Sequence, residues 1–226
     1  MSPIGQATGA DRPFLHALAR HAWKLLAALL LLAGCSNVLD SPYPVRLAYL
    51  LQAPPPQMPD PSDPGPVLLI RRFTVNPAFA GQSFVIRKDG GEFEDDFYNT
   101  FIVPPAQAIA SVTARWLRES GLFRTVISGP SELQPGLVLE ATIPALYGDF
   151  RGRPTAILEI DLRVIEVRSL PGTILYAGNF RRAVPIETAT PVGLVQGWDA
   201  ALVSILSEFA NKLGATLSRD PSFRHR

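Results

Sequence analysis

The alternation of apolar and polar residues is clearest over residues 156–167. Aliphatic side chains there fall on one face of an extended chain and charged side chains on the other; the aliphatic residues are Leu158, Ile160, Leu162 and Val164. Because side chains alternate between the two faces of a strand, this pattern predicts a strand with one buried face and one face in water. Residues 174–184 follow after a short Ser-Leu-Pro-Gly turn at 169–172, so we expect an antiparallel hairpin.

Shorter apolar segments predict further strands earlier in the chain. They lie at 46–51, 67–75, 123–127 and 136–147. Pro144 has no backbone N–H to donate, so we expect the end of the last of these strands to lie at an edge or a bulge.

A glycine-rich turn predicts an additional hairpin. Residues 84–86 are apolar, the segment 87–91 contains Asp89-Gly90-Gly91, and aromatic residues return at Phe93 and Phe97. Glycine adopts the positive φ angles of a tight turn without steric cost. We therefore expect two antiparallel strands on either side of this turn.

Apolar residues at spacings of three and four predict two helices. The first opens at Pro104-Pro105, where a missing N–H costs nothing, and ends at Gly121. The second runs from about Pro191 to Leu217, with apolar positions at Leu194, Trp198, Leu202, Ile205, Phe209 and Leu213. The expected fold class is α+β, a mostly antiparallel sheet with two main helices packed on it.

The N-terminal segment is typical of a bacterial lipoprotein signal peptide over residues 1–34. A basic flank precedes the uninterrupted apolar run 25–33, which is about half the roughly 20 residues that a membrane-spanning helix needs. The residues Leu32, Ala33, Gly34 and Cys35 then match the lipobox, in which the cysteine thiol receives a lipid. A lone cysteine is usually a small buried residue, but Cys35 stands between an apolar run and a polar stretch, so we favour lipidation.

The rest of the chain divides into a tether, one folded domain and a tail. Residues 35–46 are rich in proline and polar residues and predict a flexible lipidated tether; the domain spans 47–220 and a disordered tail 221–226. Within the domain, the proline-rich segment 53–66 favours polyproline II and predicts a spacer or surface loop rather than a ligand for an SH3-type module. Ser36 is not the aspartate that favours inner-membrane retention, so we expect the outer membrane, facing the periplasm.

Charge and histidine content exclude several function classes. The chain has 21 basic and 20 acidic residues, and removing the segment before Cys35 leaves a net charge of about −1, which gives no attraction to nucleic acid. Its three histidines lie in the leader and the tail, so the domain lacks a Ser-His-Asp triad or a zinc ligand set. We expect no enzyme, cofactor or metal, and no nucleotide motif is present.

The acidic run Glu92, Glu94, Asp95 and Asp96 leaves carboxylate chemistry or a calcium site open. Consecutive residues on a strand point to alternate faces, so we favour a solvated sheet edge, where charge also prevents aggregation.

The order of these features resembles the ABC-type transport auxiliary lipoproteins, the group that includes the paraquat-inducible protein C lipoproteins. The resemblance covers most of the mature chain and is carried by the lipobox, the strand around Tyr49-Leu50, the segments 84–87 and 96–98, the helix 106–119, the turn 120–123 and the strand 156–167. It departs from the family at 101–104, where many members have a tryptophan. It implies a non-enzymatic lipoprotein that docks a transporter permease or periplasmic substrate-binding subunit, for lipid or other hydrophobic cargo.

Phe97, Tyr98 and Phe101 are the candidate partner contact, although packing of the hairpin onto the first helix is the favoured alternative. A homo-oligomer stays open. The competing functions are an assembly or pilot lipoprotein for an outer-membrane complex, a lipid carrier with an apolar cavity, and an enzyme built on carboxylates.

Overall fold

The computed structural model describes residues 45–55, 65–168 and 171–219. The described residues belong to one compact unit, which begins at Val45. The signal peptide, the lipobox and almost all of the tether lie outside the described residues, as do the C-terminal tail, most of the proline-rich loop and the first half of the turn at 169–172.

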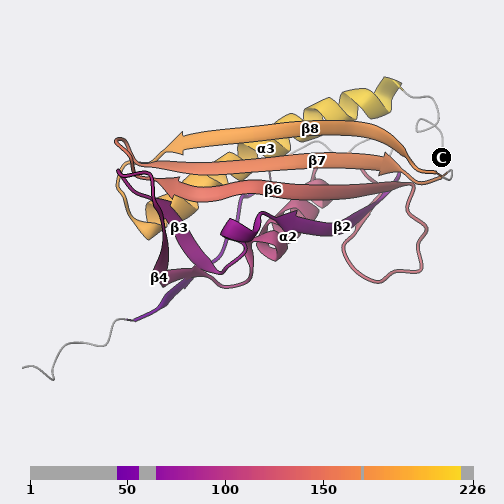
Figure 1. The fold of residues 1–226 in the computed structure, drawn as a ribbon. Helices are drawn as coiled ribbons and strands as arrows, with labels where there is room; N and C mark the ends of the chain where they lie inside the picture. The colour runs from indigo at the N-terminus through magenta and orange to yellow at the C-terminus, as the bar shows by residue number, and fades with distance from the viewer. Residues whose placement is uncertain (1–44, 56–64, 169–170, 220–226) are drawn as a thin grey trace, which may run out of the picture. The chain divides into compact units, whose positions relative to one another are not determined.

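The described unit contains a sheet of eight strands, one 3-10 turn and two long helices (Figure 1). In chain order the elements are β1 (Leu47–Tyr49), β2 (Val67–Val75), η2 (Pro77–Phe79), β3 (Ser83–Arg87), β4 (Phe93–Phe101), α2 (Pro105–Glu119), β5 (Thr125–Ile127), β6 (Leu137–Asp149), β7 (Thr155–Glu166), β8 (Thr173–Pro185) and α3 (Pro191–Arg219). The strands and helices that the hydrophobic pattern predicts are confirmed, with ends that differ by a few residues.

The sheet is mixed. Its longest pairings are antiparallel, between β6 and β7 and between β7 and β8, and β3 with β4 forms the predicted hairpin. Parallel pairings join β1 to β4, β2 to β5 and to β6, and β3 to β6. The fold class is thus confirmed as two helices on a sheet, while the parallel pairings come from strands that meet across the whole chain and leave no local signal.

A bulge interrupts β6 at the predicted proline. Thr142 pairs with Asp161 and Ala145 with Glu159, so the pairing with β7 shifts around Pro144. Because Pro144 has no N–H to give to a neighbouring strand, the irregularity falls where the ladder would lack a donor. The strand continues to Asp149 in the interior of the sheet, so the bulge alternative is the correct one.

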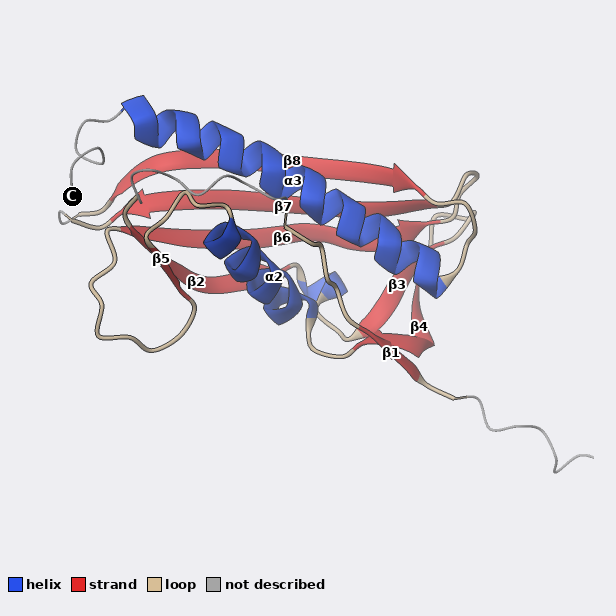
Figure 2. Cartoon of the chain, turned by 180° about the vertical axis from the view of Figure 1, so that it is seen from behind, coloured by secondary structure: helices blue, strands red, loops and turns tan. Residues whose placement is uncertain are grey.

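Both helices cover the same face of the sheet (Figure 2). α3 lies along β7 and β8, and α2 packs beside β2 and β5. The side chains that the helical spacing predicted to be apolar are buried between α3 and the sheet: Leu194, Trp198, Leu202, Ile205, Phe209 and Leu213. The opposite face of β6 to β8 carries charged residues, as the alternation of β7 predicted.

Trp198 anchors α3 to the sheet. Its indole Nε1–H donates to the carbonyl oxygen of Ile157 in β7 at 3.1 Å, and its ring contacts Phe84 edge-on with 5.1 Å between centroids. The neighbouring Gly197 lets the helix approach closely, since a Cβ there would lie 2.6 Å from the Cβ of Ala156. In the described part of the chain, neither α2 nor α3 is long and apolar enough to cross a membrane.

Candidate functional site

The predicted lipidation site cannot be placed. Leu32, Ala33, Gly34 and Cys35 fall within residues 1–44, outside the described residues. Lipidation of Cys35 therefore stays a prediction, and the geometry of the folded unit does not bear on it.

β4 is interrupted where the predicted aromatic contact lies. Phe84 of β3 pairs with Asp96, but the preceding residue Ser83 pairs with Thr100, so residues 97–99 have no partner in β3. Such a bulge turns side chains away from the regular pleat. We call residues 96–99 the aromatic bulge.

A single carboxylate stabilises the aromatic bulge. Asp96 accepts hydrogen bonds from the backbone N–H groups of Tyr98 at 3.0 Å and Asn99 at 3.1 Å, and from the side-chain amide of Asn99 at 2.7 Å. Bonding of an aspartate to backbone groups two and three residues ahead is a turn-forming pattern. An aspartate three residues before an asparagine was thus the sequence signal for this feature, which the alternation pattern alone did not reveal.

The aromatic bulge presents two rings to solvent. Phe97 is 62% exposed and Tyr98 is 45% exposed, and their rings meet edge-on with 5.4 Å between centroids. The Arg46 guanidinium lies 4.4 Å from the centre of the Phe97 ring, and its Nε–H donates to the Phe97 carbonyl oxygen at 3.0 Å. Large exposed aromatic residues beside an arginine are typical of contact surfaces, so these two residues stay candidates.

Phe101 does not belong to that surface. It is 3% exposed and packs on Phe84, with 4.6 Å between ring centroids, and on Trp198, with 5.4 Å. The core interpretation is correct for Phe101, although its helical neighbour is α3 rather than the first helix. Because it is fully enclosed, Phe101 contributes to stability and cannot touch a partner.

The acidic run lies along the exposed part of the β3–β4 hairpin. Glu92, Glu94 and Asp95 are exposed, and Glu94 forms an ion pair with Lys88 at 3.2 Å. Among the described residues no group of three or more potential ligands is gathered closely enough to hold a metal ion. Asp96 is engaged in the aromatic bulge, so these carboxylates do not converge on one point.

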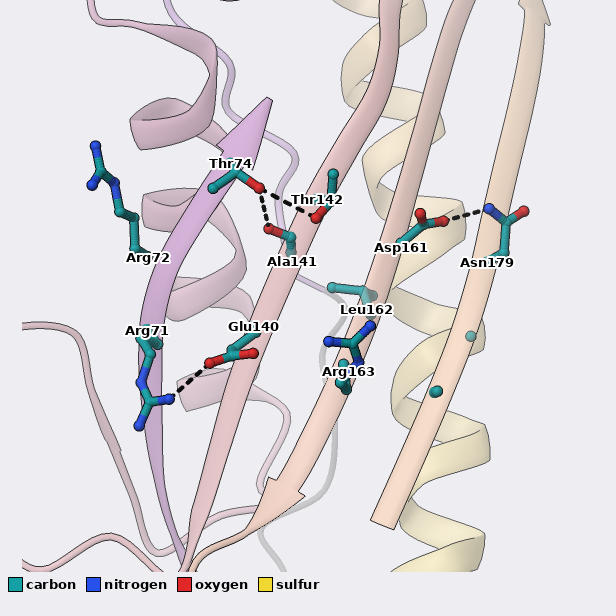
Figure 3. Close-up of a pocket in the computed structure, with 12 residues that line it drawn as sticks. Arg71, Arg72, Thr74, Glu140, Ala141, Thr142, Asp161, Leu162, Arg163 and Asn179 are labelled. Carbon is teal, nitrogen blue, oxygen red and sulfur yellow. Dashed lines mark hydrogen bonds and ion pairs between the residues drawn. The ribbon is translucent and has the colours of Figure 1, made fainter. Parts of the chain in front are cut away.

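The face of the sheet opposite the helices carries a polar hollow of about 690 Å³, formed by β2, β6, β7 and β8 (Figure 3). Arg71 is paired with Glu140 at 2.8 Å, and the hydroxyls of Thr74 and Thr142 are bonded at 3.2 Å. Asn179 donates to Asp161 on the neighbouring strand. Most polar groups of the hollow thus bond to one another across the strands.

The hollow has little reactive potential. Arg72 and Arg163 form no ion pair with any other described residue, so they offer two free guanidinium groups. No histidine or cysteine occurs in the described residues, and the hollow contains no hydroxyl bonded to a base that would activate it. Its arrangement is suited to weak polar contact.

Three carboxyl groups have shifted pKa values. Hydrogen bonding from Arg151 lowers the pKa of Asp149, and the Lys212 ammonium, followed by the Arg182 guanidinium, lowers the pKa of Glu208. Burial raises the pKa of Asp199 above its usual value of 3.8, although backbone hydrogen bonds oppose the rise. None of the three lines the hollow.

The Asp199 carboxylate of α3 also fixes the start of the proline-rich loop. Its carboxylate accepts from the backbone N–H of Gln52 at 2.8 Å and of Ala53 at 3.2 Å, and Ala53 is fully buried. The Arg115 side chain donates to the Gln52 carbonyl. The start of the proline-rich loop is therefore fixed against α2 and α3 rather than acting as a free spacer, a contact that no local pattern predicted.

The fold is shared with other solved structures. A crystal structure of a Xanthomonas campestris protein assigned to the family DUF330 matches with a TM-score of 0.61 and 15% sequence identity, over 79% of this chain and 98% of that one. A second crystal structure, of a protein described only as uncharacterized, matches with a TM-score of 0.59 and 12% identity, over 75% of this chain and 99% of that one. At such identities the likeness shows a common fold alone.

No family model matches the sequence, and no curated protein matches it. The chain thus has the fold of a DUF330 protein, with two helices packed on a mixed sheet.

Proposed function

We propose that this protein is a non-enzymatic, lipid-anchored component of a bacterial envelope ABC-type transport system, which handles lipid or other hydrophobic cargo. The observation that carries the proposal is the lipobox, Leu32 to Cys35, placed directly after a basic flank and an apolar run too short to span a membrane. Ser36, in place of the aspartate that favours the inner membrane, supports an outer-membrane anchor facing the periplasm.

The chemistry of the folded unit supports a binding role. The described residues contain no histidine and no cysteine, while Phe97 and Tyr98 are held in an exposed position by hydrogen bonds to Asp96. Rigid aromatic side chains bind partners at a low cost in conformational entropy. The likeness in fold to a DUF330 protein is consistent with this role.

The proposed mechanism is local concentration. A lipid anchor confines the folded unit to the membrane surface, and the tether 35–46 sets how far it reaches. A periplasmic substrate-binding subunit that contacts the unit would then be held beside the outer membrane, and contact with a permease would link the two membranes. Either contact shortens the path of a hydrophobic cargo across the periplasm.

The partner test is crosslinking in intact cells, followed by affinity purification and identification of the recovered proteins. We expect a permease or substrate-binding subunit with the native chain, and less of it when Phe97 and Tyr98 are both replaced by serine. Ile174→Ser is the matched control, because Ile174 is an exposed aliphatic residue of β8 outside the bulge. Recovery of a secretin or polysaccharide exporter alone would replace this proposal with the assembly function.

The anchor is tested separately. We expect the mature native protein to begin at an acylated Cys35 and to remain with membranes after a high-salt wash. The Cys35→Ser variant should keep its N-terminal segment and lack the lipid. An unmodified Cys35 in the native protein, shown by mass spectrometry, would overturn the anchor.

A further inference from the structure

One side of β2 has no strand partner over most of its length. β5 pairs with Val67, Leu68 and Leu69 and then ends at Ile127. Beyond Leu69, no strand among the described residues pairs with β2 on this side, whereas β6 pairs with the other side up to Val75. The unpaired stretch 70–75 is roughly 20 Å long at the rise of an extended strand.

Alternate backbone groups of this stretch point away from the sheet. The N–H of Asn76, directly after β2, donates to the carbonyl of Ile143 in β6 at 2.9 Å. Because backbone polar groups of successive strand residues point to opposite sides, those of Val75 and Phe73 point toward the open edge. They can accept and donate hydrogen bonds to an added strand.

α2 forms the second wall beside this edge (Figure 2). Together the edge of β2 and the helix enclose a groove of about 760 Å³. The helix lines it largely with small side chains, at Ala106, Ala110, Ser111 and Ala114. We call this the β2–α2 groove; its low wall leaves room for the side chains of an extended segment.

The β2–α2 groove is basic. Three arginines line it, Arg71, Arg72 and Arg118, and no carboxylate does. Arg71 is paired with Glu140, but neither Arg72 nor Arg118 has an ion pair with another described residue. An incoming segment would therefore meet two uncompensated positive charges next to free backbone groups.

A bulge places the arginines there. Ile70 pairs with Leu139 and Phe73 with Ala141, so the two arginines between them face one residue of β6. Bulges and charges are also devices that protect a sheet edge from aggregation. If the bulge and the arginines only protect the edge of β2, no strand should bind there at all. If they form a recognition site, binding should depend on both charge and backbone hydrogen bonds.

We propose that the β2–α2 groove binds an extended, acidic segment of a partner protein by strand addition to β2. The proposal rests on the proposed function as a binding component and names the chemistry of its partner. Backbone hydrogen bonds give such an interaction its affinity, and the arginines select acidic side chains.

The experiment uses the lipidated full chain in nanodiscs of phosphatidylcholine. The probe is a fluorescent, end-blocked eight-residue peptide of alternating valine and glutamate, and its binding is followed by fluorescence anisotropy. Two matched peptides separate the contribution of charge from that of backbone hydrogen bonds. One has lysine in place of glutamate, and the other is methylated on alternate backbone nitrogens. We expect saturable binding of the acidic peptide, weakened at least about tenfold in both matched peptides.

Variants locate the binding surface. Arg72→Glu combined with Arg118→Glu should lower the affinity for the acidic peptide at least about tenfold, because both residues are exposed and their reversal inverts the charge of the groove. Arg153→Glu, an exposed loop residue outside the groove, should leave the affinity within about twofold. Circular dichroism checks that each variant folds.

Several outcomes would overturn the proposal. Equal binding of the methylated peptide would reduce the effect to charge attraction, and an equal loss in Arg153→Glu would place binding elsewhere. A concentration-dependent dimer that the double reversal abolishes would make a second copy of the chain the occupant. If crosslinking still recovers a transporter subunit while the acidic peptide does not bind, the groove proposal fails and the proposed function stands. If the peptide binds but no transporter subunit is recovered, the groove proposal stands and the proposed function fails.

Discussion

Replacing Gly197 by alanine tests how tightly α3 is seated on the sheet. The added Cβ would lie 2.6 Å from the Cβ of Ala156 in β7 and 2.9 Å from a methyl carbon of Ile186. Carbon atoms pack best at about 3.5–4.0 Å, so in the variant α3 and β7 must move apart by roughly 1 Å at this point.

Two effects of opposite sign decide the stability of Gly197→Ala. Alanine favours a helix interior over glycine by about 1 kcal/mol. Overpacking of a tight core costs about 1–3 kcal/mol, and here the higher part applies, since Ala156 is fully buried and its Cβ, bonded directly to the backbone of β7, cannot rotate away. We expect a net loss of about 1–2 kcal/mol in the free energy of unfolding.

The assay is equilibrium unfolding in urea, with Gly214→Ala as the matched control on the same helix. A Cβ at Gly214 would lie 3.1 Å from a terminal methyl of Leu122, a flexible group that is only partly buried. The control should therefore gain up to about 1 kcal/mol from helix propensity. Both proteins carry Cys35→Ser so that no lipid contributes.

The reasoning would be refuted if Gly197→Ala were as stable as the native sequence or more so, with an unchanged denaturant slope. That result would mean that α3 shifts freely over β7. If both alanine variants lost stability equally, the close approach at Ala156 would not be the cause.

Three further predictions concern polar groups of the folded unit. Trp198→Phe removes the donor to the carbonyl of Ile157 and leaves a space, so the free energy of unfolding should fall by about 1–3 kcal/mol in urea. Asp199→Ala leaves the buried N–H of Ala53 without its acceptor and should lose about 1–3 kcal/mol, whereas Asp199→Asn keeps an acceptor without the buried charge. Because the pKa of Asp199 is raised, its ionisation lowers the free energy of unfolding as the pH rises from 3.8 through the folded-state pKa. Urea titrations at several pH values should therefore show the stability of Asp199→Asn rising relative to that of the native protein over this pH range. The pKa of Glu208 is lowered, so its stabilisation is present above pH 4.5 and lost as the pH falls through the folded-state value; Glu208→Gln should differ most from the native protein at neutral pH and low salt.

The candidate site was only partly predictable from the sequence. Phe97, Tyr98 and Phe101 were grouped because they are large aromatic residues close together in the chain, yet the structure exposes the first two and buries the third. The difference arises from the break in pairing at residues 97–99, which depends on which residue of β3 faces which residue of β4. A shift in register changes the face on which every following side chain lies.

The elements themselves were determined by the sequence, because their causes are local. Alternation in β7, helical spacing in α3 and the missing N–H of Pro144 act within a few residues, so each leaves a pattern that can be read directly. The signal layout before Cys35 is likewise a linear pattern, and it remains the source of the proposed anchor.

The tertiary structure alone decided which strands lie side by side outside the two hairpins that the sequence predicted. Segments far apart in the chain meet in the parallel pairing of β2 with β6, in the groove between β2 and α2, and in the contact of Asp199 with Gln52. The open edge of β2 likewise depends on where its pairing with β5 ends. Such contacts follow from how the apolar faces of all the elements are buried together, and their free energy belongs to the assembled core rather than to any one segment.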